Sequence, residues 1–474
     1  MKHIRNNQRL SAIVLRPLAI KSLFMLAALI LQAASAQVVV YPVPTGETNS
    51  QDYQVWVNGQ SVFCYSSFEL DNSSTETEMG RPVDPLTFAS FDFQGTVTVT
   101  VSFGSSLTNA GINTSTVTIR PLASGLTPSV SASNTITLQL SQPCQLSIEP
   151  GGQTRRPLHL FANPLETNAP LPTSANVKAL ASGTHTGADV TLSDSQSVLY
   201  FKPGVHLVPS ISPVSGETIY VAGGAVVKLK PEPANNVTYN DANYGYGIPF
   251  ALVPALINAR YVNDVTIRGR GILSSRFALE NYQRAELIRV ERCRNLKIEG
   301  VTVCDPGLWS VNLVNSDYVQ VQNLKVIGSY VNSDGVAVGG TSHVTVRDSF
   351  CHNADDAFEV KGWIPMTDVT FSNCVCWSDV GICFGLAWDV PASVSNVWFK
   401  NCTVIHDLAR TSAQPAVGMC IIVDPEFSSG VTNPGSVSGI TFENIVIEDV
   451  PGPLIAPLKV VNNWGGGGWQ ITTG

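Results

Sequence analysis

Residues 317–348 read DYVQVQNLKVIGSYVNSDGVAVGGTSHVTVRD and contain one full period of a repeating pattern. The stretch begins and ends with an aliphatic–x–aliphatic run, VQV or VTV, which is followed two residues later by Asn323 or Asp348. Because side chains alternate along a strand, both valines of a run point into a core while the middle residue points outward. The pattern therefore indicates short buried strands that end at regular turns.

The same pattern recurs through the C-terminal half of the chain. The pattern repeats about every 25 residues, as from Val319 to Val344, and each unit contains strands and no amphipathic helix. Such repetition is typical of a solenoid. We predict a parallel β-helix over residues 166–474, whose strands stack at the first aliphatic residue of each run and turn at residues that tolerate left-handed backbone. The predicted stacking positions are Val265, Leu296, Val319, Val344, Val369, Val397 and Ile440, and the predicted turns are Gly269, Gly300, Asn323, Asp348, Asn373, Asn401 and Asn444.

Residues 37–165 have a different pattern. Runs such as QDYQVWVNG, STVTIRPL and NTITLQLSQ alternate in polarity and are separated by Gly, Pro, Asn and Ser. Short strands at this spacing favour an antiparallel sandwich. The chain is thus predicted to be all-β, with an N-terminal β-sandwich before the β-helix. The expected role of the sandwich is packing or carbohydrate contact.

The first 36 residues are predicted to be a signal peptide. Five basic residues precede an apolar run, Ser22 to Leu31, and Ala34-Ser35-Ala36 is a small-x-small cleavage signal. A membrane anchor is the alternative, but the run is about ten residues long and a bilayer needs roughly 20. We expect a secreted protein, extracellular or periplasmic, with no membrane partner.

The charge of the chain excludes some partners. Formal net charge is −8, and it becomes −13 once the five positive charges of the signal peptide are removed. An acidic protein of this kind is a poor nucleic-acid binder. The ten cysteines include no CxxC pair, and Cys351 and Cys376, like Cys374 and Cys402, are expected to stack as free thiols in adjacent coils; disulfides and, more remotely, zinc ligation are alternatives. We expect a monomer.

Three aspartates interrupt the apolar pattern in consecutive coils. Asp334 lies in NSDG, residues 332–335, and Asp355 and Asp356 lie in NADD, residues 353–356. Because each segment leads into an apolar run, VAV or AFEV, we expect Asp334 and Asp355 to lie one above the other, with Asp356 beside them. Carboxylates this close repel one another, so at least one pKa should rise. A protonated acid beside ionised carboxylates is what glycoside hydrolysis needs.

Aromatic residues flank these acids along the chain, and sugar rings pack on aromatic faces. We expect substrate binding by Trp309, Lys361, Trp363, Trp377 and Asp379. His352 is expected at a surface or turn position, and His406, two coils further on, is a weaker candidate for the site than His352. Several alternatives remain open. Asp334 could be a turn residue, the acid pair could bind calcium, and the tryptophans could serve packing alone. No metal or cofactor is expected.

At these residues the chain resembles the right-handed β-helix glycoside hydrolases. That clan contains the polygalacturonases of family 28 and the dextranase/isopullulanase family 49, which share N-[ST]-D-G followed by D-D, here NSDG and ADDAF. The resemblance implies inversion, with Asp355 as general acid and with Asp334 and Asp356 holding the attacking water. An inverting pair lies about 6.5–9.5 Å apart.

Two departures from family 28 favour family 49 and a neutral α-glucan of the dextran or pullulan type. Polygalacturonases carry Gly-His-Gly one coil after the acid pair, but DVGICFGLAWD, residues 379–389, has no histidine. They also carry Arg-x-Lys further on, but VGMCIIVD, residues 417–424, has no basic residue. A β domain before the β-helix is also the arrangement of family 49.

Three rival functions remain at this point. A pectin hydrolase would need basic subsite residues, for which Lys361, Lys400 and Arg410 are candidates. A β-helix lyase would need calcium and a basic residue beside the acids. A non-catalytic glycan-binding β-helix would not require acids in adjacent coils.

Overall fold

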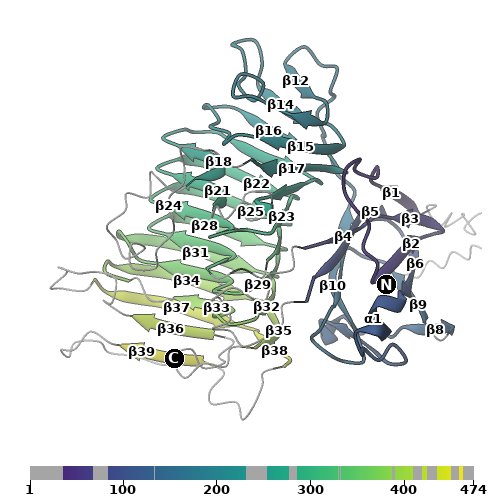
Figure 1. Ribbon diagram of the computed structural model, residues 1–474. Coiled ribbons are helices and arrows are strands. Elements are labelled where there is room, and N and C mark those ends of the chain that lie inside the picture. Colours follow the sequence, from purple (N-terminus) through teal and green to yellow (C-terminus); the bar gives the residue numbers. More distant parts are fainter. Residues whose placement is uncertain are drawn as a thin grey trace, which may run out of the picture.

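The computed structural model describes residues 36–67, 84–132, 134–230, 254–276, 285–328, 330, 332–386, 390–408, 419–423, 435–449 and 458–462. Its strands form five sheets, two before residue 165 and three after residue 176, which confirms the predicted all-β fold (Figure 1). The predicted signal peptide lies outside the described residues except for Ala36. Within the described ranges, no helix combines the length and apolar character that crossing a membrane requires.

The N-terminal part is a sandwich of two sheets around one core. The first sheet contains β1 (Gln37–Val40), β4 (Cys64–Ser66), β5 (Thr87–Gln94), β7 (Val117–Arg120), β10 (Cys144–Pro150) and β11 (Leu158–Pro164). The second contains β2 (Tyr53–Val57), β3 (Gln60–Val62), β6 (Val97–Phe103), β8 (Ser129–Ala132) and β9 (Thr135–Leu140), and the helical turns are α1 (Ser105–Asn109) and η2 (Leu122–Ser124). The alternation of β6, VTVTVSF, buries every second side chain in this core.

Three parallel sheets build the β-helix, named here the first, second and third sheet. The first contains β12 (Val177–Leu180), β14 (Val198–Phe201), β16 (Thr218–Val221), β19 (Thr266–Gly269), β22 (Arg294–Glu299), β25 (Asp317–Gln322), β28 (Ser342–Arg347), β31 (Met366–Ser372), β34 (Val394–Lys400) and β37 (Val437–Glu443). The second contains β13 (Gly183–Thr184), β15 (Gly204–Val208), β17 (Ala225–Leu229), β20 (Ile272–Ser274), β23 (Thr302–Cys304), β26 (Lys325–Ile327), β29 (Phe350–Asn353), β32 (Val375–Ser378), β35 (Thr403–Asp407) and β38 (Val446–Ile447). The third contains β18 (Ala255–Arg260), β21 (Glu286–Glu291), β24 (Val311–Val314), β27 (Val336–Gly339), β30 (Phe358–Lys361), β33 (Phe384–Leu386), β36 (Met419–Val423) and β39 (Leu458–Asn462).

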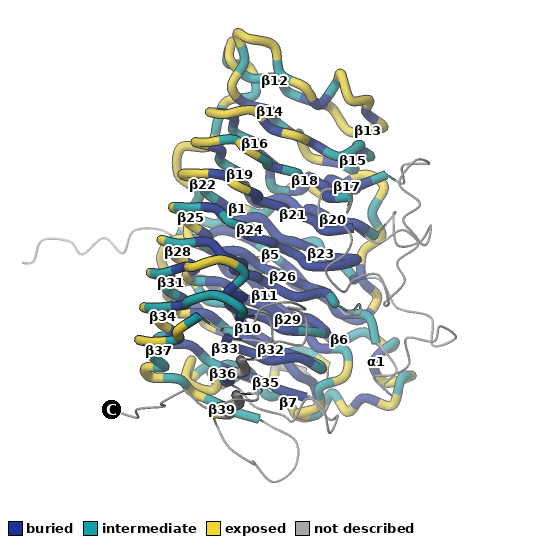
Figure 2. Tube along the Cα trace, turned by 90° about the vertical axis from the view of Figure 1, so that its left-hand side faces the viewer, coloured by how far each residue is buried: buried dark blue, intermediate teal, exposed yellow. Residues whose placement is uncertain are grey.

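The stacking of the first sheet confirms the predicted repeat. The successive register partners in this sheet are Leu296, Val319, Val344, Val369, Val397 and Ile440. Their side chains join a continuous core inside the coils. Figure 2 shows the resulting stack, in which buried residues follow the strands and exposed residues gather at the turns along one edge.

The turns after these strands adopt the predicted left-handed backbone. The φ angles lie between 51° and 54° at Asn323, Asp348, Asn373, Asn401 and Asn444. Side chains also bond along the axis, since Asn373 Nδ2 donates to Asp348 Oδ1 at 2.6 Å and Asn444 Nδ2 donates to Asn401 Oδ1 at 2.9 Å. All ten cysteines are free thiols, which agrees with the expectation for the pairs Cys351/Cys376 and Cys374/Cys402, and Cys351 stacks on Cys376 in register.

The sandwich packs on the outer face of the second sheet, and the third sheet lies on the other side of the β-helix (Figure 1). Phe88 and Phe161 of the sandwich share an apolar cluster with Phe350 and other residues of the second sheet. The buried ion pair between Arg270 Nε and Asp92 Oδ1, at 2.9 Å, also joins the two parts. The outer face of the third sheet is therefore not the one that the sandwich covers.

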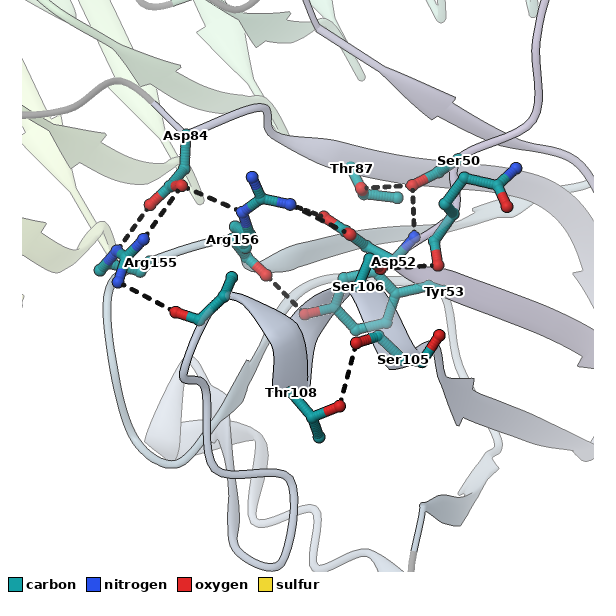
Figure 3. A network of polar contacts seen from close by, with 12 residues as sticks. Ser50, Asp52, Tyr53, Asp84, Thr87, Ser105, Ser106, Thr108, Arg155 and Arg156 are labelled. Atoms are coloured by element: carbon teal, nitrogen blue, oxygen red, sulfur yellow. Dashed lines mark hydrogen bonds and ion pairs between the residues drawn. The ribbon is translucent and has the colours of Figure 1, made fainter.

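A separate charged network lies inside the sandwich (Figure 3). Arg155 Nε lies 2.7 Å from Asp84 Oδ2, and Arg156 pairs with both Asp84 and Asp52. The Tyr53 hydroxyl donates to the Arg156 carbonyl at 2.5 Å. Because these charges neutralise one another, we interpret the network as a structural tie between loops.

Candidate active site

Three carboxyl groups meet beside two neighbouring strands of the third sheet. Asp334 lies two residues before β27, Asp356 lies two residues before β30, and Glu359 lies within β30. Carboxyl oxygens of the three residues lie within 4.8 Å of one another. The three residues are 4%, 3% and 1% exposed, respectively. The structure thus brings together two predicted acids and one that the sequence analysis missed.

The register of these strands corrects one expectation. β27 and β30 pair Val336 with Phe358, and the Gly335 amide donates to the Asp356 carbonyl at 2.8 Å. Asp334 therefore stacks on Asp356, and the prediction that it stacks on Asp355 is wrong by one residue. The cause is the turn before β30, which has one residue more between its asparagine and its strand than the turn before β27.

Asp355 lies at the edge of the cluster and is partly exposed, unlike Asp334 and Asp356. Its Oδ1 accepts a hydrogen bond from the Asp356 amide at 2.9 Å, and its carbonyl accepts one from Ser378 Oγ at 3.0 Å. Its carboxyl group is therefore both fixed in place and open to a substrate.

Asn353 holds the backbone of the acid pair. Its buried Nδ2 lies within hydrogen-bond distance of three carbonyl oxygens, at 3.1 Å from Ser333, 2.8 Å from Asp355 and 3.0 Å from Asp356. The amide thus ties the turn before β27 to the turn before β30. The sequence analysis quoted Asn353 as part of the motif and gave it no role.

Burial and mutual repulsion raise the pKa of all three aspartates. Burial raises the pKa of Asp334 well above its usual range, and the charges of Glu359 and Asp355 raise it further. Burial and the Asp356 charge raise the pKa of Asp355 to about 7, while burial and Glu359 raise the pKa of Asp356 to about 8. The nearby Lys361 ammonium opposes each shift. The prediction that at least one pKa rises is confirmed.

Lys361 and two tryptophans lie on the same outer face as the acids. Lys361 Nζ lies 2.9 Å from Glu359 Oε2 and 5.8 Å from the centre of the Trp309 ring. Trp309 is one coil before Asp334, as predicted, and its ring centre is 5.7 Å from that of Trp363 at an interplanar angle of 30°. The structure thus groups Lys361, Trp309 and Trp363 next to the acid cluster.

Trp377 is placed elsewhere, and the prediction that it faces a sugar is wrong. It belongs to β32 of the second sheet, is 1% exposed, and lies in the apolar cluster under the sandwich. Its ring stacks on His352 at a centroid distance of 4.1 Å, and its Nε1 donates to Asp379 Oδ1 at 3.0 Å. Register explains the difference, because β32 pairs Trp377 with His352 and not with the acids.

The residues around Trp377 require two further corrections. His352 is 1% exposed and is a strand residue, so the expectation of a surface or turn position is wrong. His406 is equally buried and lies in β35. Asp379 Oδ2 lies 3.3 Å from His352 Nε2, which holds this carboxylate at the edge of the interface rather than in the acid cluster. Asp379 is still linked to the site through its amide, which donates to the Asn353 carbonyl at 2.9 Å.

Replacing Trp377 by alanine should therefore lower stability and leave substrate affinity unchanged. Truncating a buried tryptophan costs about 3–5 kcal/mol of unfolding free energy. Urea unfolding measures this loss, and KM of the variant that remains folded should equal that of the wild type. A higher KM with normal stability would instead restore Trp377 as a sugar contact.

The acid cluster also contains the kind of oxygens that bind a divalent cation. Oxygens of Asp334, Asp356 and Glu359 are close enough to meet around one divalent ion. The Lys361 ammonium already supplies a positive charge at Glu359, so the cluster is partly neutralised by the protein itself.

The arrangement can act chemically as a proton donor, Asp355, beside buried proton acceptors.

Comparison with known proteins agrees with this geometry. A family model described as glycosyl hydrolases family 28 matches residues 274–468, which include the three aspartates. A dextranase of Arthrobacter sp. (strain CB-8) is 26% identical over 225 residues, 45% of this chain and 33% of the dextranase. A probable polygalacturonase of Arabidopsis thaliana is 24% identical over 176 residues, 36% of this chain and 35% of that protein. The chain therefore matches about a third of the length of these curated relatives.

One solved structure is similar over both parts of the molecule. Dex49A from Penicillium minioluteum superposes with a TM-score of 0.55 and 16% sequence identity, over 89% of this chain and 96% of that chain. At this identity the likeness shows the fold, a sandwich followed by a β-helix. The matched family model and the two sequence relatives thus show that the chain is similar to glycoside hydrolases of two kinds, dextranases and polygalacturonases.

Proposed function

We propose that the protein is a secreted glycoside hydrolase that cleaves a neutral α-glucan of the dextran or pullulan type with inversion. Asp355 acts as the general acid, and Asp334 and Asp356 activate water. One observation carries this assignment: a partly exposed carboxyl group with a pKa of about 7 lies beside two buried carboxyl groups that stack in register. An inverting glycosidase needs this division between one donor and a separate acceptor site.

The proposed reaction is a single displacement. Asp355 gives its proton to the glycosidic oxygen as the bond to the anomeric carbon breaks. A water molecule held by Asp334 and Asp356 attacks that carbon from the opposite face and loses a proton to this pair. The proton is later returned to Asp355 through solvent, which its partial exposure allows.

The charges beside the acids favour a neutral sugar. Lys361 is 5% exposed and forms its ion pair with Glu359, so a galacturonate carboxylate would have to compete with Glu359 for it. Of the other candidates for a pectin hydrolase, Lys400 ends β34 in the first sheet, and Arg410 lies outside the described residues. The Trp309 and Trp363 rings offer an apolar surface of the kind on which sugar rings pack.

A pectin-type substrate is the second candidate, because polygalacturonases are among the sequence relatives. The deciding experiment measures reducing-sugar release by the wild type from dextran, pullulan and polygalacturonate side by side. NMR of the first product gives its anomeric configuration. Release from dextran or pullulan with inversion supports the proposal. Release from polygalacturonate alone would show that the substrate is a pectin and not a neutral α-glucan. A retained configuration would contradict the assigned roles.

Activity should depend on pH as a bell with limbs near neutrality. The working state needs one proton on the donor and an ionised acceptor pair, and the pKa values of Asp355 and Asp356 are about 7 and about 8. These steps belong to the coupled cluster and not to single residues, so kcat/KM should fall below about pH 7 as the cluster binds a further proton and above about pH 8 as it loses its last one. A stopped assay across pH 4–10 tests this, and an acid limb near pH 4, the value of exposed carboxyls, would contradict it.

A further inference from the structure

Glu359 is a buried acid on the outer face of the third sheet. Its register partners on the two neighbouring strands are Ala337 of β27 and Gly385 of β33. Both are small and uncharged, so the groups that face Glu359 come from elsewhere. They are Asp334 and Asp356 from the turns before β27 and β30, with Lys361 two residues further along β30.

The carboxyl groups of this cluster include buried oxygens that receive no hydrogen bond from the described residues. Asp334 Oδ1 and Glu359 Oε1 are buried, and no described residue donates a hydrogen bond to either atom. Ionised carboxylates only accept hydrogen bonds, so two of them side by side leave both oxygens unsatisfied, and a buried unsatisfied acceptor is unfavourable. One bound proton removes the problem, because a protonated carboxyl donates to its neighbour.

The charge balance agrees with this interpretation. One ammonium group, that of Lys361, lies 2.9 Å from Glu359 Oε2 and faces three carboxyl groups that are at most 4% exposed. Three full negative charges against one positive charge would be strongly unfavourable in a buried site. The ion pair places negative charge on Glu359, which leaves the bound proton to Asp334 or Asp356, where it can be donated to Glu359.

We propose that Glu359 is a positioning residue that, with Lys361 as its counter-ion, holds a bound proton on Asp334 or Asp356 and so sets the pH at which this pair can accept the proton of the attacking water. Nothing in the motif NSDG…ADD requires a glutamate at this place. The part of the inference that concerns turnover rests on the proposed function, and the part that concerns the bound proton does not.

The bound proton has a consequence for stability that needs no substrate. The pKa of Asp334 and Asp356 is raised in the folded protein, and an unfolded aspartate titrates near 4. Between about pH 4 and pH 8 the folded protein therefore holds protons that the unfolded chain has lost. The contribution of these two groups to the free energy of unfolding therefore falls as pH rises through this range, whereas His159, His185 and His206, whose pKa values burial lowers, contribute in the opposite direction below about pH 7.

The test replaces Glu359 by glutamine, which keeps the shape, removes the charge and can donate a hydrogen bond. Urea unfolding at several pH values between 5 and 8 gives the protons released on unfolding. We expect E359Q to release about one proton fewer than the wild type, because Asp334 and Asp356 no longer face its charge. In kcat/KM, the acid limb should move to lower pH by about one unit or more.

The matched control is Glu291→Gln. Glu291 is 9% exposed, lies on β21 three strands away in the same sheet, and pairs with Arg260 at 2.9 Å. The control also loses a poorly exposed ion pair, so it should lose stability without moving the acid limb. If E359Q shows the same pattern, with stability lost and neither proton release nor limb moved, Glu359 is only structural and the inference is wrong.

Three further results separate the inference from its premises. If no glucan or pectin is cleaved, the proposed function fails, but the proton count of E359Q still decides the role of Glu359. If E359Q does not fold, the wild type decides alone, because an unfolding free energy that does not fall between pH 7 and 8, above the range in which the buried histidines oppose the effect, overturns the inference. Loss of wild-type activity on chelation, restored by Ca²⁺, would also overturn it in favour of a cation.

Discussion

Replacing Asp355 by asparagine should lower kcat on dextran or pullulan by about 10²–10⁴-fold, the usual contribution of a general acid. Asparagine has the same shape and keeps an oxygen that can accept the Asp356 amide, now at 2.9 Å from Asp355 Oδ1. It cannot give a proton to the glycosidic oxygen. The free energy of unfolding should therefore change little, because Asp355 is the partly exposed member of the cluster. Reducing-sugar assays and urea unfolding of the same preparation measure both quantities.

The choice of leaving group makes this experiment specific. A substrate whose aglycone is already a good leaving group, such as a glycosyl fluoride, needs no proton from the enzyme. The Asp355→Asn variant should recover most of its loss on such a substrate, whereas Asp356→Asn, which lacks a proton acceptor, should not. Equal losses for both variants on both substrates would reject the separation of roles between Asp355 and Asp356.

Gly381→Ala should lower kcat by about 10²-fold or more, although this residue carries no chemistry. A Cβ added at Gly381 would lie 2.3 Å from both the Asp355 carbonyl carbon and the Asp356 nitrogen. Real Cβ atoms do not approach backbone this closely, so the peptide that joins the two acids must move. Displacing a catalytic group by about 1 Å can cost 10²-fold in rate. Initial rates and a thermal melt on the folded variant measure the effect.

Gly187→Ala is the matched control, because an added Cβ at this exposed glycine meets nothing within 4 Å. This variant should keep the activity and the stability of the wild type. If Gly381→Ala also keeps full activity, the peptide between the acids tolerates displacement. The rigid placement of Asp355 and Asp356 would then not be required for turnover.

The sequence determined the strands and turns of the β-helix because those signals are local. Alternation of apolar residues and a left-handed turn residue occur together in each coil, and the register of Leu296, Val319 and Val344 follows directly from them. The stacked apolar side chains must all point inward, so a shift of the strand register by one residue would turn them all outward. The same argument located all three aspartates in adjacent coils.

The sequence did not determine which acids stack. Turn lengths vary between coils, and one additional residue before β30 moved Asp356, not Asp355, onto Asp334. Two residues of the site were also missed for a local reason. Glu359 occupies the outward position of an apolar strand, where a polar residue is ordinary, and Asn353 resembles the turn asparagines of the other coils.

What only the tertiary structure decided is the fate of the outward-facing side chains. Trp377 and Glu359 both point away from the coil interior, and nothing in their local sequence distinguishes a sugar contact from a packing residue. The sandwich covers the second sheet, which buries Trp377 against His352 under the sandwich. On the third sheet, Glu359 instead meets Asp334, Asp356 and Lys361. Strand periodicity fixes only whether a side chain points in or out; what an outward side chain touches depends on residues far away in the chain, which no local pattern contains.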